Sequence, residues 1–195
     1  MPVDSMPQDA VVIVMACRLE PWKGHELLLD ALTQIQNLSS WHCWITGRPQ
    51  RPIEATYLRK LHQRVEQQKL GERIHFLGHC ENLPHVLAAA DIHCQPNTGP
   101  ESLGITFVEA LYAGLPVVTT AMGGALEIVN DSCGILVPPG NVGALSAILR
   151  RLIEDEPART VLGAAGPARA SELCDPERNM NRLYSIFRER FQNVT

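Results

Sequence analysis

Continuous apolar runs alternate along this chain with segments whose apolar positions recur every three or four residues. The continuous runs predict buried strands, at residues 11–16, 42–46, 73–77, 91–95, 115–119 and 133–137. The periodic segments predict helices, at residues 26–35, 54–69, 83–89, 105–112, 141–152, 157–170 and 176–191. Strand and helix therefore alternate with short loops from residue 11 onward.

This alternation predicts an α/β fold, namely a doubly wound, Rossmann-like domain with a mostly parallel six-stranded sheet. No repeat, low-complexity tract or linker interrupts the pattern, so we expect a tail over residues 1–10 and one domain over residues 11–195. Ligands of such sheets bind beyond the carboxyl ends of the strands, near the point where the strand order reverses. Charged residues that follow strands are therefore candidates for a site, and they are Arg18, Lys23, Arg48, Glu101 and Glu127.

The composition is that of an ordinary globular protein, with 45% apolar residues and a net charge of −4 in a chain of 195 residues. Lys and Arg do not cluster, so we expect no nucleic-acid partner. The polar first ten residues lack the apolar core of a secretory signal, and the six cysteines include no C-x-x-C pair. A cytoplasmic protein with reduced cysteines is the expectation.

The dipeptide His-Cys occurs three times, at residues 42–43, 79–80 and 93–94. Metal ligation is one interpretation, and packing at strand edges is the other. Adjacent residues of a strand point to opposite faces, so such a pair does not readily serve one ion. Packing is therefore the preferred interpretation, and no metal site is predicted.

Familiar nucleotide fingerprints are absent from the sequence. No G-x-G-x-x-G follows the first strand, no P-loop lysine follows the glycines at 99 and 104, and Asp-x-Asp does not occur. A dinucleotide-dependent dehydrogenase and a P-loop NTPase are therefore disfavoured. A carboxylate clamp for a metal-bound diphosphate is not visible either.

Two cations follow the first predicted strand instead. Arg18 and Lys23 lie five residues apart in a loop that ends at Gly24. A guanidinium fork and an ammonium group together offset the charge of a diphosphate without a divalent ion. The alternative is that both are solvent-exposed loop charges, which is the commoner fate of Arg and Lys.

Residues 96–127 read as a loop, a helix, a strand and a Gly-Gly loop in succession. Ser102 is the expected cap of the helix, and Glu101 and Glu109 lie eight residues apart at its start and inside it. Free N–H groups at a helix start, beside carboxylates, suit a ligand that carries both phosphate and hydroxyls. A carboxylate on the helix surface is the alternative for Glu109, and a first-turn cap is the alternative for Glu127.

Several segments together resemble the retaining, nucleotide-sugar-dependent glycosyltransferases of family 4, which have the GT-B fold. Residues 16–24 (ACRLEPWKG) are similar to the segment GRL-x-x-x-KG of that family, with Cys17 in place of the usual glycine, and residues 100–110 (PESLGITFVEA) are similar to its E-x7-E signature. Further matches complete the pattern, at residues 74–78 (IHFLG), 114–118 (GLPVV), 123–124 (GG), 127–129 (EIV) and 134–140 (GILVPPG). The resemblance covers about residues 11–190.

The resemblance implies that this chain is the C-terminal, donor-binding half of such an enzyme. Arg18 and Lys23 would hold the donor diphosphate, Glu101 the hydroxyls of the transferred sugar, and Glu109 the ribose. Arg18, Lys23 and Glu101 are accordingly the expected catalytic residues. The resemblance places the chain at the helix start around the phosphate and sugar of the donor, at Ser102, Leu103, Gly104 and Ile105. It places Arg48 and residues 78–81 at the border of the base.

By the same resemblance, the reaction is transfer of a sugar from a UDP-, GDP- or ADP-sugar to a glycan, lipid or small-molecule acceptor, with retention and without metal or cofactor. The N-terminal acceptor-binding half is expected to be missing, so the isolated domain would bind the donor without transferring it. Any contact with the inner face of a membrane would be made through that half. A non-catalytic nucleotide-sugar binding module and a nucleotide-sugar epimerase or phosphorylase of the same fold stay open as alternatives. A flavodoxin-like signalling domain is disfavoured because no acidic cluster follows the first strand.

The last predicted helix carries a wide apolar stripe, made by Met180, Leu183, Tyr184, Phe187 and Phe191. Core packing is the first expectation for such a stripe. The resemblance offers another, because terminal helices of the family cross back to the missing half. In that case part of the stripe would be exposed in this chain, and the chain would self-associate.

Overall fold

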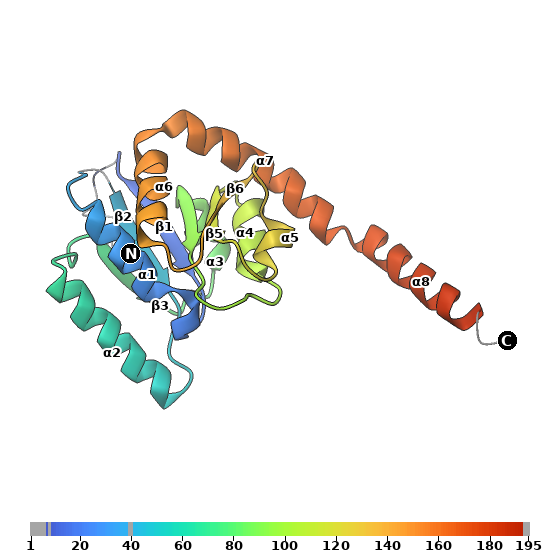
Figure 1. The fold of residues 1–195 in the computed structure, drawn as a ribbon, viewed down its shortest axis with the longest axis horizontal. Coiled ribbons are helices and arrows are strands. Elements are labelled where there is room, and N and C mark those ends of the chain that lie inside the picture. The colour runs from blue at the N-terminus through green and yellow to red at the C-terminus, as the bar shows by residue number, and fades with distance from the viewer. Residues whose placement is uncertain (1–6, 8, 39–40, 193–195) are drawn as a thin grey trace.

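Six parallel strands form one sheet at the centre of the molecule (Figure 1). The computed structural model describes residues 7, 9–38 and 41–192, so most of the expected tail over residues 1–10 lies outside the described residues. The strand order is β3-β2-β1-β4-β5-β6. The strands are β1 (Val11–Ala16), β2 (Trp41–Thr46), β3 (Ile74–Gly78), β4 (Ile92–Gln95), β5 (Val117–Thr120) and β6 (Gly134–Val137).

All five strand pairings are parallel, and the predicted six-stranded α/β fold is confirmed. Every residue of β1 is buried, as its continuous apolar sequence predicts, because helices cover the sheet on both faces. The observed strand bounds differ from the predicted ones by at most two residues at either end.

Two helical layers enclose the sheet and bury two apolar clusters (Figure 1). One cluster packs beneath α1 (His25–Gln34), α2 (Pro52–Gln67) and α6 (Val142–Glu154). The other packs beneath four helices, namely α3 (Leu83–Ala88), α4 (Ile105–Tyr112), α5 (Ala125–Ile128) and α7 (Glu156–Cys174). The remaining elements are the short 3-10 helix η2 (Pro21–Lys23) and α8 (Pro176–Gln192). Within the described residues, no helix combines the length and the hydropathy that a membrane span needs.

The strand order reverses between β1 and β4, which are neighbours in the sheet. The loops that follow these two strands therefore lie against each other at the carboxyl edge. The N–H of Thr98 donates to the carbonyl of Trp22 over 2.8 Å. Gly24 has φ +88°, and a Cβ built on it would lie 1.8 Å from the carbonyl oxygen of Pro96. A ligand site at this reversal is what the fold class predicts.

Helix α4 begins at Ile105, where the apolar period predicts it. Its N-cap is Gly104, at φ +64°, and no side chain caps it, so the expected capping by Ser102 is wrong. The carbonyl of Glu101, next to Ser102, instead accepts from the N–H of Gly124 in the loop after β5. Glycine then adopts the left-handed conformation at the turn into the helix.

Two short elements escape prediction from the sequence. Helices η2 and α5 have three and four residues, too few to show a helical period. Glu127 lies exposed in the first turn of α5, the position that the alternative supposed, although no side-chain hydrogen bond caps this helix.

Helix α8 projects away from the rest of the molecule (Figure 1). Its residues 176–191 are all exposed, with 53% of Phe187 and 72% of Phe191 accessible. Core packing of its apolar stripe, the first expectation, is therefore wrong for this chain, and the alternative of an exposed stripe is confirmed. A helix that exposes two stacked aromatic rings, Phe187 and Phe191, presents a surface suited to association.

We expect the exposed stripe of α8 to make the chain self-associate. Replacing Phe187 and Phe191 together by Ser should shift a concentration-dependent oligomer to monomer, because it removes the two aromatic rings of the stripe. Analytical ultracentrifugation measures the shift. Replacing the exposed charged residues Arg188 and Glu189 by Ser is the control on the same helix. A wild-type chain that stays monomeric at all concentrations contradicts the prediction.

Two histidines lie inside the domain in neutral form. Burial lowers the pKa of His25 to about 4, with a smaller contribution from the charge of Lys23, and burial lowers the pKa of His93 to about 3. Neither ring nitrogen of His93 has a hydrogen-bond partner, and the ring packs edge-on against Phe107. An unfolded histidine titrates near pH 6.5, so the unfolded state binds protons that the folded state excludes.

Acid is therefore expected to destabilise the domain. Stability is greatest above pH 6.5 and falls as the pH drops toward the folded pKa values, by about 2 kcal/mol per buried histidine between pH 7 and pH 5. Urea titrations at several pH values measure this slope. The variant His93→Gln, which does not titrate, should show a shallower slope than the wild type.

Candidate functional site

A buried ion pair joins the two loops at the strand-order reversal. The Nζ of Lys23 donates to Oε2 of Glu101 over 2.5 Å, and the side chains are 10% and 8% exposed. Lys23 is the last residue of η2, and its ammonium also lies 4.1 Å from the ring centroid of Trp22. Two residues 78 positions apart in the sequence thus meet because β1 and β4 are neighbours.

Further donors surround the carboxylate of Glu101. Gln95 and Asn97, both buried, place their side-chain amide nitrogens 3.2 and 3.3 Å from Oε2. The backbone N–H of Ser102 donates to the other oxygen, Oε1, over 3.2 Å. Burial on its own would raise the pKa of Glu101, but the hydrogen bond and charge of Lys23, with the bonds from Asn97 and Ser102, outweigh it and lower the pKa. The group is therefore ionised at neutral pH.

A cavity of about 320 Å³ adjoins this network at the carboxyl ends of β1 and β2. Arg18 and Arg48 both line it, as the sequence predicted for residues on one edge of the sheet. The side chain of Arg18 is 59% exposed and lies 3.1 Å from Glu20. Thr106 also lines the cavity, and its hydroxyl donates to Oε1 of Gln95 over 3.2 Å, which connects the cavity to the amides around Glu101.

The start of α4 stands beside the same network. Leu103 and Ile105 are exposed there, and no side chain occupies the capping position at Gly104. Glu109 lies one turn into the helix at an exposed position, and partial burial of its carboxyl group raises its pKa. The lining of the 320 Å³ cavity includes neither Glu109 nor the ion pair of Lys23 and Glu101, and the cavity is connected to that pair through Thr106 and Gln95. The structure thus brings Lys23 into contact with Glu101 and Arg18 close to Arg48, whereas Glu109 stands apart from both pairs.

Three polar residues of this site were not among the predicted ones. Gln95, Asn97 and Thr106 are uncharged, whereas the candidates predicted at strand ends were charged residues. The sequence nevertheless indicates these residues. Gln95 ends the fourth strand, Asn97 follows two residues later, and Thr106 lies in the first turn of the next helix. Polar amides at a strand end next to a predicted carboxylate are the pattern that would have identified them.

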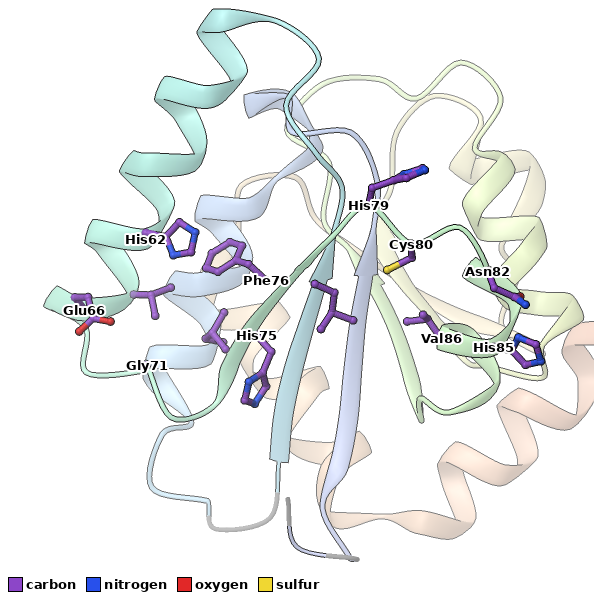
Figure 2. Close-up of a pocket in the computed structure, with 13 residues that line it drawn as sticks. His62, Glu66, Gly71, His75, Phe76, His79, Cys80, Asn82, His85 and Val86 are labelled. Carbon is purple, nitrogen blue, oxygen red and sulfur yellow. The ribbon is translucent and has the colours of Figure 1, made fainter. Parts of the chain in front are cut away.

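A larger cavity, of about 970 Å³, lies elsewhere, beside the edge strand β3 and between α2 and α3 (Figure 2). His62 and Glu66 of α2 border one side of it, and His85 of α3 borders the other. Its lining includes neither Lys nor Arg, so it offers no fixed positive charge to a diphosphate. The smaller cavity lined by Arg18 is therefore the better candidate for such a ligand.

The three His-Cys pairs lie in different settings. His42-Cys43 and His93-Cys94 belong to β2 and β4, and His79-Cys80 directly follows the end of β3, where Cys80 packs against the second apolar cluster. Nδ1 of His42 lies 3.0 Å from Nε2 of His75, at the distance of a hydrogen bond. Among the described residues, no three His, Cys, Asp or Glu side chains are grouped so that they could hold a metal ion.

The family model and the relatives that match this sequence are all glycosyltransferases. Residues 3–169 match glycosyl transferases group 1. A GDP-mannose-dependent monoacylated alpha-(1-6)-phosphatidylinositol monomannoside mannosyltransferase of Corynebacterium glutamicum is 35% identical over 173 residues, which are 80% of this chain and 42% of that protein. The human alpha-1,3/1,6-mannosyltransferase ALG2 is 28% identical over 192 residues, covering 93% of this chain and 46% of its own length.

Solved structures agree with the fold. Anabaena Alr3699/HepE, in complex with UDP and glucose, superposes with a TM-score of 0.82 at 31% identity, over 91% of this chain and 49% of that one. The C-terminal domain of a group 1 glycosyl transferase, LpcC of Francisella tularensis, shares the fold with a TM-score of 0.76 at 23% identity, over 87% of this chain and 88% of that one.

The fraction of each relative that the chain covers shows which part of those proteins it matches. The chain spans about half the length of the curated relatives it matches and most of an isolated C-terminal domain. The conserved architecture is the six-stranded parallel domain described above. The chain belongs to the glycosyl transferases group 1 family and has the fold of the C-terminal half of GT-B glycosyltransferases.

Proposed function

We propose that this chain binds a nucleoside-diphosphate sugar at the carboxyl edge of its sheet and, together with an acceptor-binding domain, transfers the sugar with retention of anomeric configuration. The observation that carries the proposal is the buried Lys23–Glu101 pair beside a cavity lined by Arg18 and Arg48. It combines fixed positive charge with a carboxylate that accepts hydroxyl hydrogen bonds. Those are the two chemistries that a nucleotide sugar requires.

Lys23 and Arg18 are assigned to the diphosphate. An ammonium group has three donors, and a single hydrogen bond, to Glu101, is observed for Lys23, so two donors remain for phosphate oxygens. Arg18 adds a planar fork from an exposed position at the mouth of the cavity. Backbone amides at Leu103, Gly104 and Ile105 add the partial positive charge of a helix start. Together these groups stabilise the diphosphate as it departs.

Glu101 is assigned to the hydroxyls of the sugar. Its Oε2 already accepts from Lys23, Gln95 and Asn97, whereas Oε1 accepts from Ser102 N–H alone and has a free lone pair. The proposed role is orientation of the sugar, because the two-carboxylate arrangement of glycoside hydrolases is not visible here. Arg48 borders the base and Glu109 contacts the ribose in this proposal, which requires the donor to extend from the cavity across the first turn of α4.

The names of the relatives indicate the chemical class of the donor and of the acceptor. One relative is named as GDP-mannose-dependent and another is named in complex with UDP and glucose, so a hexose on UDP or GDP is the proposed donor. The proposed acceptor is a lipid or a glycan, and contact with a membrane surface belongs to the acceptor-binding domain. Residues 11–195 form the donor-binding domain in this proposal, and charge compensation by Arg18 and Lys23 makes the reaction independent of divalent ions.

A calorimetric screen of UDP-, GDP- and ADP-sugars in the presence of EDTA tests the proposal. Binding of one base class in the micromolar range, without metal, is the expected result. Absence of binding by all three classes overturns the proposal. Turnover assays with and without the acceptor-binding domain of a relative then separate the alternatives: an epimerase acts on the donor alone, and a non-catalytic module never transfers.

A further inference from the structure

Two buried amide side chains converge on one oxygen of Glu101. Nε2 of Gln95 lies 3.2 Å from Oε2, and Nδ2 of Asn97 lies 3.3 Å from the same atom. Nε2 of Gln95 also donates to Oδ1 of Asn97 over 2.9 Å, so the two amides hold each other. With Lys23, Oε2 of Glu101 thus accepts three hydrogen bonds from three side chains, which belong to the loop after β1 and to the end of β4.

Hydroxyl groups of three threonines hold the two amide residues in place. Thr106 donates to the Gln95 side chain over 3.2 Å, Thr119 to the Gln95 carbonyl over 2.8 Å, and Thr120 to the Asn97 carbonyl over 2.7 Å. Thr119 and Thr120 are fully buried in β5, and Thr106 lies in the first turn of α4. Thr119 and Thr120 thus fix the backbone, whereas the bond from Thr106 and the bond between the two amides restrain the side chains, so a carboxylate bonded to them has little freedom to turn.

Geometry leaves one atom of Glu101 for a ligand. Oε2 is saturated, and the bond from the N–H of Ser102 uses only one lone pair of Oε1. A diphosphate held by Lys23 would bring negative charge close to this carboxylate and repel it. Without fixed donors on Oε2, the carboxylate would rotate away or gain a proton, and Oε1 would lose its direction.

We propose that Gln95 and Asn97 are positioning residues, which hold the Glu101 carboxylate by Oε2 so that Oε1 faces the sugar of the donor. This inference rests on the function proposed above. It adds that sugar recognition, separately from diphosphate recognition, depends on the two amides. It further implies that the amides contribute to the selection of a donor with a hydroxyl group at the position Oε1 reaches.

The test compares a nucleotide with its sugar derivative. Calorimetry on the full chain measures dissociation constants for UDP and UDP-glucose, and for GDP and GDP-mannose, in wild type, Asn97→Ala and Gln95→Met. The ratio of the constant for the sugar nucleotide to that for the nucleotide should rise about tenfold in each variant, because one charge-assisted hydrogen bond to Glu101 is lost. Asn130→Ala, at an exposed asparagine outside the site, should leave the ratio unchanged.

Each outcome decides the matter. A ratio that stays constant, whether both affinities fall together or neither changes, overturns the positioning role, since a purely structural residue affects nucleotide and sugar nucleotide alike. Wild-type chain that binds none of the four ligands contradicts the proposed UDP or GDP donor, an outcome distinct from failure of this inference. If neither variant folds, NMR of the wild type measures solvent exchange of the side-chain amide protons of Gln95 and Asn97 with the sugar nucleotide bound. Amide protons that remain protected support the proposal. Rapid exchange of these protons overturns it.

Discussion

Replacement of Lys23 by alanine is expected to weaken binding of a nucleoside diphosphate about 100-fold, because charge-assisted hydrogen bonds of this kind contribute about 1.5–3 kcal/mol. The ammonium group is the buried cation at the carboxyl edge, held 2.5 Å from Glu101. No other Lys or Arg takes part in the hydrogen bonds described for that carboxylate. Isothermal titration calorimetry with UDP and GDP measures the loss.

The same change also removes the partner of a buried carboxylate, so folding and binding must be separated. The double variant Lys23→Met with Glu101→Gln deletes both charges and leaves no uncompensated ion, so its stability should recover while its affinity stays low. Arg18→Ala should weaken binding without affecting stability, since Arg18 is largely exposed. Lys60→Ala, at an exposed pair with Glu26, should change neither quantity measurably. Full affinity in the double variant would contradict the assignment of Lys23.

Replacement of Gly24 by alanine is expected to destabilise the domain by about 3 kcal/mol or more, the sum of left-handed strain and overpacking. The added Cβ would lie 1.8 Å from the Pro96 carbonyl oxygen and 3.3 Å from the Asn97 nitrogen, at φ +88°. Both neighbours are backbone atoms, so a side-chain rotation cannot relieve the clash. The loops after β1 and β4 must separate, which also pulls Lys23 away from Glu101.

Chemical denaturation measures this loss, with Gly143→Ala as the matched control. Gly143 has ordinary backbone angles in the first turn of α6, and its nearest neighbour to an added Cβ is Oδ1 of Asn141 at 3.6 Å. Alanine there should leave stability unchanged or raise it by up to about 1 kcal/mol, because it lowers the entropy of the unfolded chain. Equal effects at the two glycines would show that the close approach of the loops is not what destabilises the Gly24 variant.

Prediction from sequence succeeded for elements whose signal is local. A continuous apolar run such as Val11–Ala16 indicates a strand buried on both faces, and the period of α2 or α6 indicates a helix. It failed where tertiary contacts decide. Ser102 carries the chemistry of a helix cap, yet the N-cap is Gly104, and the chain beside Ser102 bonds to the loop after β5 through the Glu101 carbonyl and the Gly124 N–H. The apolar stripe of α8 is real, but no part of the described chain covers it.

The site shows the same division. The rule that parallel strands end at one edge was enough to place Arg18, Lys23, Arg48 and Glu101 on one side of the sheet. It did not show that Lys23 pairs with Glu101, nor that Gln95 and Asn97 complete the carboxylate's hydrogen bonds. Spacing along the chain says nothing about the orientation of side chains across a loop contact.

The sequence by itself therefore determined the α/β fold, the parallel sheet and the edge that carries the candidate site, because apolar period and the order of strand-end residues are properties of single segments. Its motifs, by their resemblance, indicated the family. The tertiary structure alone decided which charges meet, which are buried and which glycine has no room for a side chain. The physical reason is that these contacts form only where β1 and β4 bring together two loops that lie more than seventy residues apart in the sequence. Burial at that loop contact lowers the local dielectric and so strengthens the ion pair of Lys23 and Glu101.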